Sequence, residues 1–357
     1  MHSPQASPSA PVPELFLPSR LEDLAEVFGK LGGGRSILLA DSFDCGTTPV
    51  PGGAGPWLGV RTSGTTGQPG TCWHRWDGLR MNAVAASGYR GWVWASPFRA
   101  DSFAGVQVAL QAWVSSGRAV SLAGAWSEQW KLLERLRPQA VCATPTYLDL
   151  LAVSEADFRP AGGGWLPQQV TLGGEPLRET VGARLKARFP GARFTLVYAA
   201  AEWGLIAKTG RVDGWFEAGD RVSGWSDWRV NEGVLELFRE GKWLATGDLA
   251  EEQEGRVRIL GRASAVANVG GTKVRLAAVE VLAESVPGVR MARAVAEANP
   301  VTGQVVGLRY SVLPGADSER VRVALETCLR ANLPKAAWPR VWDGAWSGLG
   351  PNGKKGT

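Results

Sequence analysis

The chain has 357 residues, of which 45% are apolar and 20% are charged. This composition excludes global disorder and leaves room for two domains, or for one large domain with a small appendage. The net charge of +5 suits a polyanionic substrate, but the basic residues are scattered and form no block, so the sequence does not favour nucleic-acid binding.

The number and spacing of cysteines and histidines exclude several kinds of catalytic and metal site. Four cysteines lie far apart without a CxxC pair, which is typical of reduced thiols in a cytoplasmic protein. The only histidines are His2 and His74, which argues against a Ser-His-Asp triad or a histidine-based metal site. Residues 1–13 lack the basic and apolar regions of a signal peptide and are predicted to be a disordered tail. No apolar run is long enough to cross a bilayer, so we expect a cytoplasmic protein without stable membrane association.

Helical and strand patterns alternate from residue 20 onwards. We expect helices over 20–31, 103–115, 128–136, 145–153 and 176–188, and strands over 36–40, 57–60, 91–95, 119–122, 140–143, 169–172 and 193–198. Apolar strands joined by helices predict an α/β domain built on a mostly parallel, doubly wound sheet.

The pattern changes after residue 226. Three closely spaced strands are expected over 227–230, 234–238 and 256–260, with short turns that indicate antiparallel hairpins. A smaller unit then follows, with helices over 277–285 and 318–331 and strands over 293–296 and 305–312. We therefore predict a large domain over 14–261, with a distorted antiparallel part beside the parallel sheet, and a small α+β domain over 262–357.

A loop of hydroxyl residues and glycines follows the apolar run at 57–60, with the sequence Thr62-Ser63-Gly64-Thr65-Thr66-Gly67-Gln68-Pro69. Such a loop can turn several backbone N–H groups and hydroxyls toward one anion. It has neither the GK[ST] end of a Walker loop nor the GxGxxG pattern of a dinucleotide fold. The loop alone is a candidate phosphate site, and a flexible Gly/Thr turn is the open alternative.

This loop resembles, nearly letter for letter, the [ST]SGTTGxPK loop of the adenylate-forming acyl- and aryl-CoA ligases. Further stretches match that family's motifs in the family's order, from about residue 57 to the C-terminus. They are GGEPL at 173–177, YAAAE at 198–202, WLATGD at 243–248, GR at 261–262, GGTKV at 270–274 with VE at 279–280, and PNGK at 351–354. Each is a common turn or strand end by itself, so the resemblance rests on their order.

The resemblance implies ATP, Mg²⁺ and coenzyme A as the bound molecules. The family's loop holds the triphosphate, which implies contacts from Thr62, Ser63, Gly64, Thr65, Thr66 and Gly67. The family's tyrosine stacks on adenine and its aspartate takes the ribose hydroxyls, which implies Tyr198 and Asp248. The Mg²⁺ ligands implied are Glu202 and Thr65.

The remaining motifs imply contacts at the rest of the substrates. The turn that contains Gly174 and Glu175 would run alongside the adenine and acyl pocket, and Arg262 would contact the nucleotide. Gly271 and Lys273 would face coenzyme A. Lys354 would carry the charge that bridges the carboxylate and the α-phosphate, with Thr65 and Glu202 as the other catalytic groups.

The chain departs from the family pattern at several positions. Gly70 replaces the loop lysine, Ala201 replaces a threonine, and Ser264 replaces the hinge aspartate. The segment 97–105 lacks the family's histidine, and only about 60 residues precede the phosphate loop. A shortened N-terminal region trims the wall of the acyl pocket, which favours a small aromatic carboxylic acid as substrate.

Within the family the chain looks most like the o-succinylbenzoate–CoA ligases of menaquinone and phylloquinone biosynthesis, especially short cyanobacterial forms. The expected reaction is therefore the ATP-dependent, AMP-forming conversion of o-succinylbenzoate to its CoA thioester. Three alternatives stay open: another acyl- or aryl-CoA ligase, an adenylation enzyme that loads a carrier protein, and a degenerate, non-catalytic nucleotide-binding paralogue. A homodimer is also left open.

Overall fold

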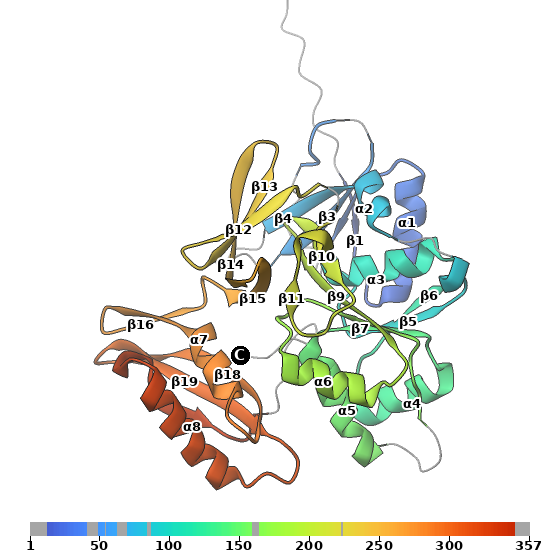
Figure 1. Ribbon diagram of the computed structural model, residues 1–357. Helices are drawn as coiled ribbons and strands as arrows, with labels where there is room; N and C mark the ends of the chain where they lie inside the picture. Colours follow the sequence, from blue (N-terminus) through green and yellow to red (C-terminus); the bar gives the residue numbers. More distant parts are fainter. Residues whose placement is uncertain are drawn as a thin grey trace, which may run out of the picture.

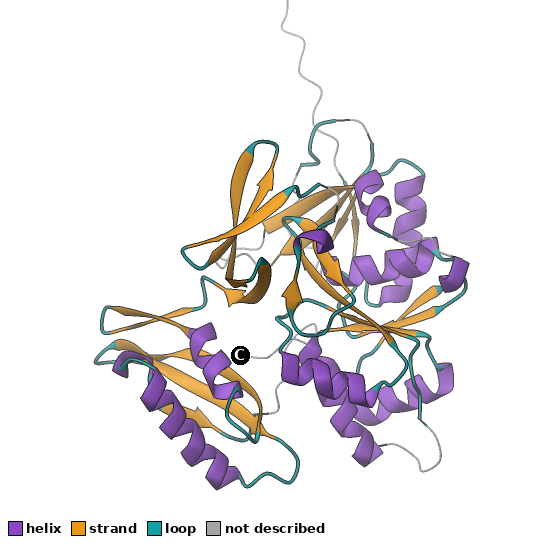
Figure 2. Cartoon of the chain, in the orientation of Figure 1, coloured by secondary structure: helices purple, strands orange, loops and turns teal. Residues whose placement is uncertain are grey.

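In a computed structural model of the protein, the described residues are 13–40, 49–53, 55–62, 70–83, 87–158, 164–222 and 224–346, without the side chains of 156–158. These residues form four β-sheets with helices packed between and outside them (Figure 1). Figure 2 separates the strands of each sheet from the helices that cover them.

The central sheet has the strand order β10-β9-β8-β7-β5-β6. Its strands run parallel except for β10, which is antiparallel to β9. The strands are β5 (Val93–Ser96), β6 (Arg118–Ser121), β7 (Ala140–Ala143), β8 (Gln169–Leu172), β9 (Arg193–Ala200) and β10 (Gly204–Thr209), and the connecting helices are α3 (Phe103–Val114), α4 (Trp126–Leu136), α5 (Pro145–Phe158) and α6 (Glu179–Arg188). All four residues of β7 are buried, which explains why a short apolar run was enough to predict it.

Two hydrophobic cores flank this sheet. One gathers Trp130, Leu151 and Leu185 from the α4–α6 layer against β7, β8 and β9. The other gathers Phe28 and Leu110 from α1 (Leu24–Gly32) and α3, together with the strands of a second sheet. Both faces of the parallel sheet are therefore covered, and the predicted α/β fold class is confirmed.

The second sheet has the order β1-β2-β3-β4 and carries the residues that flank the candidate phosphate loop. Its elements are β1 (Glu14–Phe16), β2 (Ile37–Leu39), β3 (Trp57–Thr62), β4 (Gly70–Arg75) and the following helix α2 (Trp76–Asn82). Strands β3 and β4 are antiparallel, and their ladder ends with Thr62 opposite Gly70. Residues 63–69 thus connect two paired neighbours.

The third sheet is antiparallel, with the order β11-β15-β14-β13-β12. Its strands are β11 (Trp215–Phe216), β12 (Asp227–Asn231), β13 (Val234–Arg239), β14 (Lys242–Gln253) and β15 (Arg256–Arg262). Trp228, Leu235 and Val257 turn toward the core that also contains Trp130 and Leu151. This face fixes the antiparallel sheet against the central domain.

The C-terminal unit is a separate α+β layer. A sheet with the order β17-β16-β19-β18, with β20 beside β19, packs against two helices. The elements are β16 (Val266–Val269), β17 (Thr272–Arg275), α7 (Leu276–Glu284), β18 (Val289–Asn299), β19 (Gly303–Val312), α8 (Ser318–Asn332) and β20 (Val341–Asp343). Val279, Leu308 and Leu325 are buried in its own core. Asp317 caps α8 by accepting hydrogen bonds from the N–H groups of Glu319 and Arg320.

Short 3₁₀ turns complete the fold: Leu21–Asp23, Ser87–Tyr89, Ala218–Asp220 and Lys335–Ala337. Several helices differ from their predicted bounds: α6 begins at Glu179 rather than at residue 176, α5 continues to Phe158 rather than ending at 153, and α1 begins at Leu24 after a 3₁₀ turn. Across the described ranges, no helix has the length and apolarity needed to span a membrane. The thiols of Cys72, Cys142 and Cys328 are free.

Candidate functional site

Tyr198, Asp248 and Arg262 form a hydrogen-bonded cluster between the central and antiparallel sheets. The Tyr198 hydroxyl donates to Asp248 Oδ2 at 2.6 Å, and Arg262 Nε lies 3.2 Å from Asp248 Oδ1. Asp248 is 6% exposed, whereas the Arg262 side chain is 44% exposed. The structure thus brings together three residues that the motifs single out separately.

Local backbone geometry aims the Asp248 carboxylate. Asp248 and Arg262 are directly opposed in the β14–β15 ladder, and the register shifts immediately afterwards, between Leu249 and Ala250. Gly247 has a φ of +75°, which favours glycine. Thr246 Oγ1 donates to the Leu235 carbonyl and accepts from the Asp248 N–H, at 2.9 and 3.1 Å. The Thr-Gly-Asp sequence is therefore a bulged strand with its threonine buried as an internal brace.

The electrostatics of the cluster keep the Tyr198 phenol neutral. Burial and the neighbouring Asp248 carboxylate raise the pKa of the Tyr198 hydroxyl well above its usual value. Tyr198 is therefore a hydrogen-bond donor at neutral pH. A carboxylate oxygen accepts hydrogen bonds from hydroxyl groups as well as from charged donors. The arrangement can bind a diol.

Glu202 is exposed in the turn between β9 and β10, and its charge acts on Cys72 and His74 of strand β4. Its charge raises the pKa of the Cys72 thiol, after the larger effect of burial. Cys72 also interacts with the Thr62 side chain, and Thr62 pairs with Gly70. Glu202 is thus next to the strand that begins where the candidate phosphate loop ends.

His74, two residues beyond Cys72, is packed in the same region. Its ring stacks on Phe103 at a centroid distance of 4.7 Å, and burial lowers its pKa to about 4. Nearby Glu202 and the backbone of Ala201 oppose this effect only in part. His74 is a neutral packing residue at physiological pH, and sequence reasoning gave no signal for its contact with Phe103.

The turn at 173–177 links β8 to α6 beside β9. Gly174 has a φ of +80° and is exposed, and Glu175 is partly buried. The Leu177 carbonyl lies so close to Gly214 that a Cβ there would approach it to 2.2 Å. This backbone contact holds the predicted adenine and acyl turn against the entry to β11.

Two other predicted site residues belong to the C-terminal unit. Gly270 and Gly271 form the two-residue turn between β16 and β17, with φ values of +55° and +85°. Lys273 is exposed on β17. These residues lie on a different sheet from Asp248. Ser63, Gly64, Thr65, Thr66, Gly67 and Lys354 lie outside the described residues.

The donor set fits a magnesium ion held partly by substrate. Within the described part of the chain, no group of three or more His, Cys, Asp or Glu side chains forms a metal cage. Mg²⁺ in nucleotide enzymes usually binds one or two carboxylates, phosphate oxygens and water. The exposed Glu202 carboxylate, next to the residues that flank the candidate phosphate loop, is an oxygen donor of the kind that Mg²⁺ takes.

Comparison with known proteins agrees with the fold. The family described as AMP-binding enzyme matches residues 61–228. A search of curated proteins found no match. Among solved structures, the anthranilate CoA ligase AuaEII in complex with anthranoyl-AMP has a TM-score of 0.62 and 15% identity, over 96% of this chain and 75% of that one.

Two further solved structures have a similar fold. A variant of Escherichia coli MenE with bound OSB-AMS has a TM-score of 0.61 and 15% identity, over 89% of this chain and 75% of that one. The amide bond synthetase McbA from Marinactinospora thermotolerans has a TM-score of 0.58 and 21% identity, over 96% of this chain and 77% of that one. At these identities the likeness concerns the fold.

Proposed function

We propose that this protein is an ATP-dependent, AMP-forming acid–CoA ligase, and the match of residues 61–228 to the family described as AMP-binding enzyme supports this proposal. The observation that carries the proposal is the Asp248 carboxylate, held by Tyr198 on one oxygen and by Arg262 on the other. A buried carboxylate that two neighbours hold in one orientation suits the vicinal hydroxyls of a ribose.

The first step joins the acid to the nucleotide. The acid's carboxylate attacks the α-phosphorus of ATP, the bond to the β-phosphate oxygen breaks, and pyrophosphate leaves. Asp248 holds the ribose, and Tyr198 stacks on adenine while its hydroxyl orients Asp248. Thr62 and the loop at 63–67 bind the triphosphate, and Lys354 stabilises the charge that develops between the two reactants.

The second step transfers the acyl group to a thiol. The coenzyme A sulfur attacks the acyl carbon of the adenylate, the bond to the phosphate oxygen breaks, and AMP leaves with the electron pair. Gly271 and Lys273, on the β16–β17 hairpin, contact coenzyme A in this proposal. Mg²⁺, held by Glu202, Thr65 and phosphate oxygens, would neutralise charge on the phosphates. Neither step needs a nucleophile from the protein.

The proposed acid is o-succinylbenzoate, which would place the enzyme in menaquinone or phylloquinone biosynthesis. The aromatic ligands named for MenE and AuaEII support an aromatic acid. The proposed enzyme acts in the cytoplasm on a small molecule.

Acid-dependent exchange of labelled pyrophosphate into ATP tests the proposal. The purified protein is assayed with o-succinylbenzoate, anthranilate and benzoate, with AMP release then measured with and without coenzyme A. We expect exchange with o-succinylbenzoate and a CoA thioester product. Lys354→Ala should abolish exchange, whereas Lys355→Ala, its neighbour in sequence, is the matched control and should retain it.

Each other outcome contradicts a defined part of the proposal. Exchange with a different acid contradicts the proposed substrate. Adenylate formation without transfer to coenzyme A contradicts the proposed acceptor. ATP binding without exchange for any acid contradicts the ligase reaction and supports a non-catalytic paralogue, for which Gly70, Ala201 and Ser264 are the sequence argument.

A further inference from the structure

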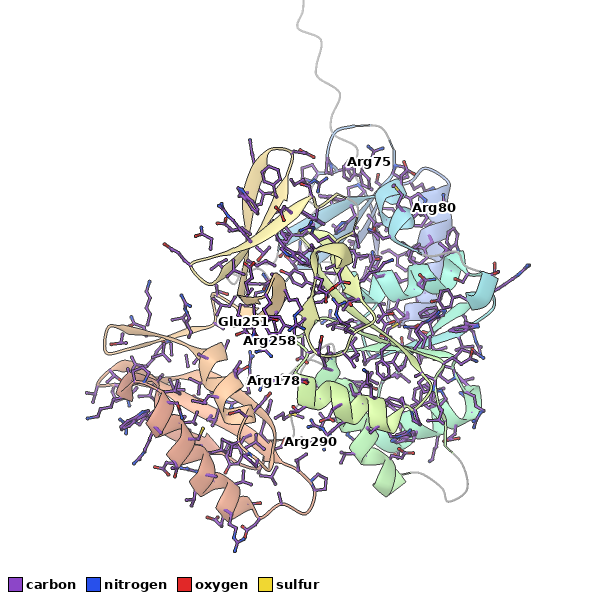
Figure 3. All side chains as sticks on the ribbon, viewed as in Figure 1. Arg75, Arg80, Arg178, Glu251, Arg258 and Arg290 are labelled. Atoms are coloured by element: carbon purple, nitrogen blue, oxygen red, sulfur yellow. The ribbon has the colours of Figure 1, made fainter. Side chains whose placement is uncertain are left out.

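Two ion-pair clusters join the C-terminal unit to the helical layer of the large domain. In the first, Arg178, in the segment before α6, donates to the Glu280 carbonyl at 3.2 Å and pairs with the Glu284 carboxylate. Both acceptors belong to α7. Figure 3 draws Arg178 and Arg290 along the boundary between the C-terminal unit and the rest of the chain.

The second cluster is centred on Asp149 of α5. Arg290, on β18, lies 3.3 Å through Nε from Asp149 Oδ2 and also donates to the Asp149 carbonyl. Arg184, on α6, donates to both carboxylate oxygens at 2.9 Å. Asp149 thus holds one arginine from each side of the boundary.

Burial distinguishes these contacts from ordinary surface salt bridges. The Glu284 side chain is 6% exposed, and those of Arg290 and Asp149 are 5% and 6% exposed. Burial lowers the pKa of Arg178 to about 10, although the charges of Glu280 and Glu175 oppose that effect. Undocking the unit would separate Arg178 from Glu284 and Arg290 from Asp149, and breaking a buried ion pair is strongly destabilising.

The acidic side of the first cluster is itself fixed. Glu284 Oε1 accepts from the Ala292 N–H at 2.6 Å, and Glu280 Oε1 accepts from the Ala294 N–H at 3.0 Å. These bonds tie α7 to β18, so α7 and its carboxylates move with the sheet of the C-terminal unit. Arg178 therefore contacts a rigid part of that unit.

On its other side, Arg178 adjoins the turn at 173–177. It directly follows Leu177, whose carbonyl is packed against Gly214, and the Glu175 charge acts on its guanidinium. The charge of Arg258, labelled beside Arg178 in Figure 3, further lowers the pKa of Arg178. The residue that contacts α7 is thus only four residues from Gly174 and three from Glu175.

We propose that Arg178 is a positioning residue that orders the turn at 173–177 when the C-terminal unit is docked, through its contacts with Glu280 and Glu284 of α7. That this ordering serves nucleotide binding rests on the proposed function. The Arg290–Asp149 pair docks the same unit without adjoining the turn, which supplies the control.

Hydrogen–deuterium exchange of the full chain without ligand tests the coupling. Arg178→Ala and Arg290→Ala each remove one cross-boundary pair and should each speed exchange in α7. Only Arg178→Ala should speed exchange at the amides of 173–177, by about tenfold. Arg178→Lys keeps the charge and should restore protection of the turn in part. Unchanged exchange at the turn in Arg178→Ala, or an equal increase in Arg290→Ala, would overturn the proposal.

Calorimetric titration with MgATP then tests the link to the nucleotide. Arg178→Ala should raise the Kd for ATP by about tenfold, with Arg290→Ala much closer to the wild type. Equal effects of the two variants would contradict the link. Failure of the wild-type protein to bind ATP would contradict the proposed function, whereas the exchange result of the ligand-free protein would still decide the coupling.

Discussion

Tyr198 and Asp248 come from different sheets, 50 residues apart, and are joined by a hydrogen bond of 2.6 Å. The bond connects the residue proposed to stack on adenine with the residue proposed to hold ribose. The two parts of a nucleoside would therefore meet side chains that already orient each other, which lowers the ordering cost of binding.

Replacement of Tyr198 by phenylalanine separates these roles. Tyr198→Phe keeps the ring but removes the donor to Asp248, so we expect the KM for ATP to rise by about tenfold with little loss of thermal stability. The preference for ATP over 2′-deoxy-ATP should fall as well. Tyr89→Phe is the matched control, because the Tyr89 hydroxyl accepts from Arg193 at the start of β9. An unchanged nucleotide preference in Tyr198→Phe would contradict the proposed role.

Asp248→Asn should cause a larger loss. The amide cannot act as a charged acceptor and no longer neutralises Arg262, so acid-dependent pyrophosphate exchange should fall by about 100-fold. Asp227→Asn removes an exposed carboxylate from the same sheet, where it pairs with Arg221, and should change exchange by less than about twofold. Similar rates in the two variants would exclude Asp248 from the nucleotide site.

The stability of the protein should depend on pH through His74. Burial lowers its folded-state pKa to about 4, below the unfolded value of 6.5. As pH falls through this window, the unfolded state takes up the proton first, so a contribution present above pH 6.5 is progressively lost. We expect this group to remove about 2 kcal/mol from the free energy of unfolding between pH 7.5 and 5.

Urea denaturation at the two pH values measures this effect. His74→Phe retains an aromatic ring to stack on Phe103 but does not titrate, so it should lose less stability on acidification than the wild type. The only other histidine offers the control, His2→Gln, which should behave like the wild type. An identical pH dependence in His74→Phe and the wild type would contradict the assignment to His74.

Gly70→Lys should restore a positive charge at the end of the phosphate loop. Gly70 does not have a positive φ, and an added Cβ would lie 3.3 Å from Thr62 Oγ1, so a small shift accommodates it. We expect the KM for ATP to fall by about threefold in the exchange assay. Gly70→Gln, with a similar length and no charge, should show no such gain. A higher KM in the lysine variant alone would contradict a phosphate nearby.

The buried elements could be predicted from the sequence because their patterns are local. The strand at 140–143 has the predicted bounds, and β8 has the bounds expected from an apolar run between turns. Strand β14 escaped prediction because Gly247 and the register shift after Leu249 interrupt its alternation. Strand β4 escaped for a related reason, since none of its residues is fully buried.

The candidate site was likewise predictable in part: the sequence identified individual residues but not the contacts between them. Motif order singled out Tyr198, Asp248 and Arg262, but their hydrogen bonds depend on the β14–β15 register and on the approach of β9. Arg178 and Glu280 are 102 residues apart, and Arg290 and Asp149 are 141 apart. No local periodicity reports contacts over such separations, so the ion pairs between the two units could not be predicted from the sequence.

The pairing of Thr62 with Gly70 also bears on how the phosphate loop can vary among descendants of this protein. Residues 63–69 must leave one strand and return to its hydrogen-bonded neighbour, whatever side chains they carry. A substitution within residues 63–69 leaves the pairing of Thr62 with Gly70 unchanged. An insertion or deletion there must either change the path between these two residues or shift the β3–β4 register. A register shift of one residue would move every side chain of β4, including those of Cys72 and His74, to the opposite face of the sheet. We therefore expect the length of this loop to be conserved more strongly than the identities of its residues.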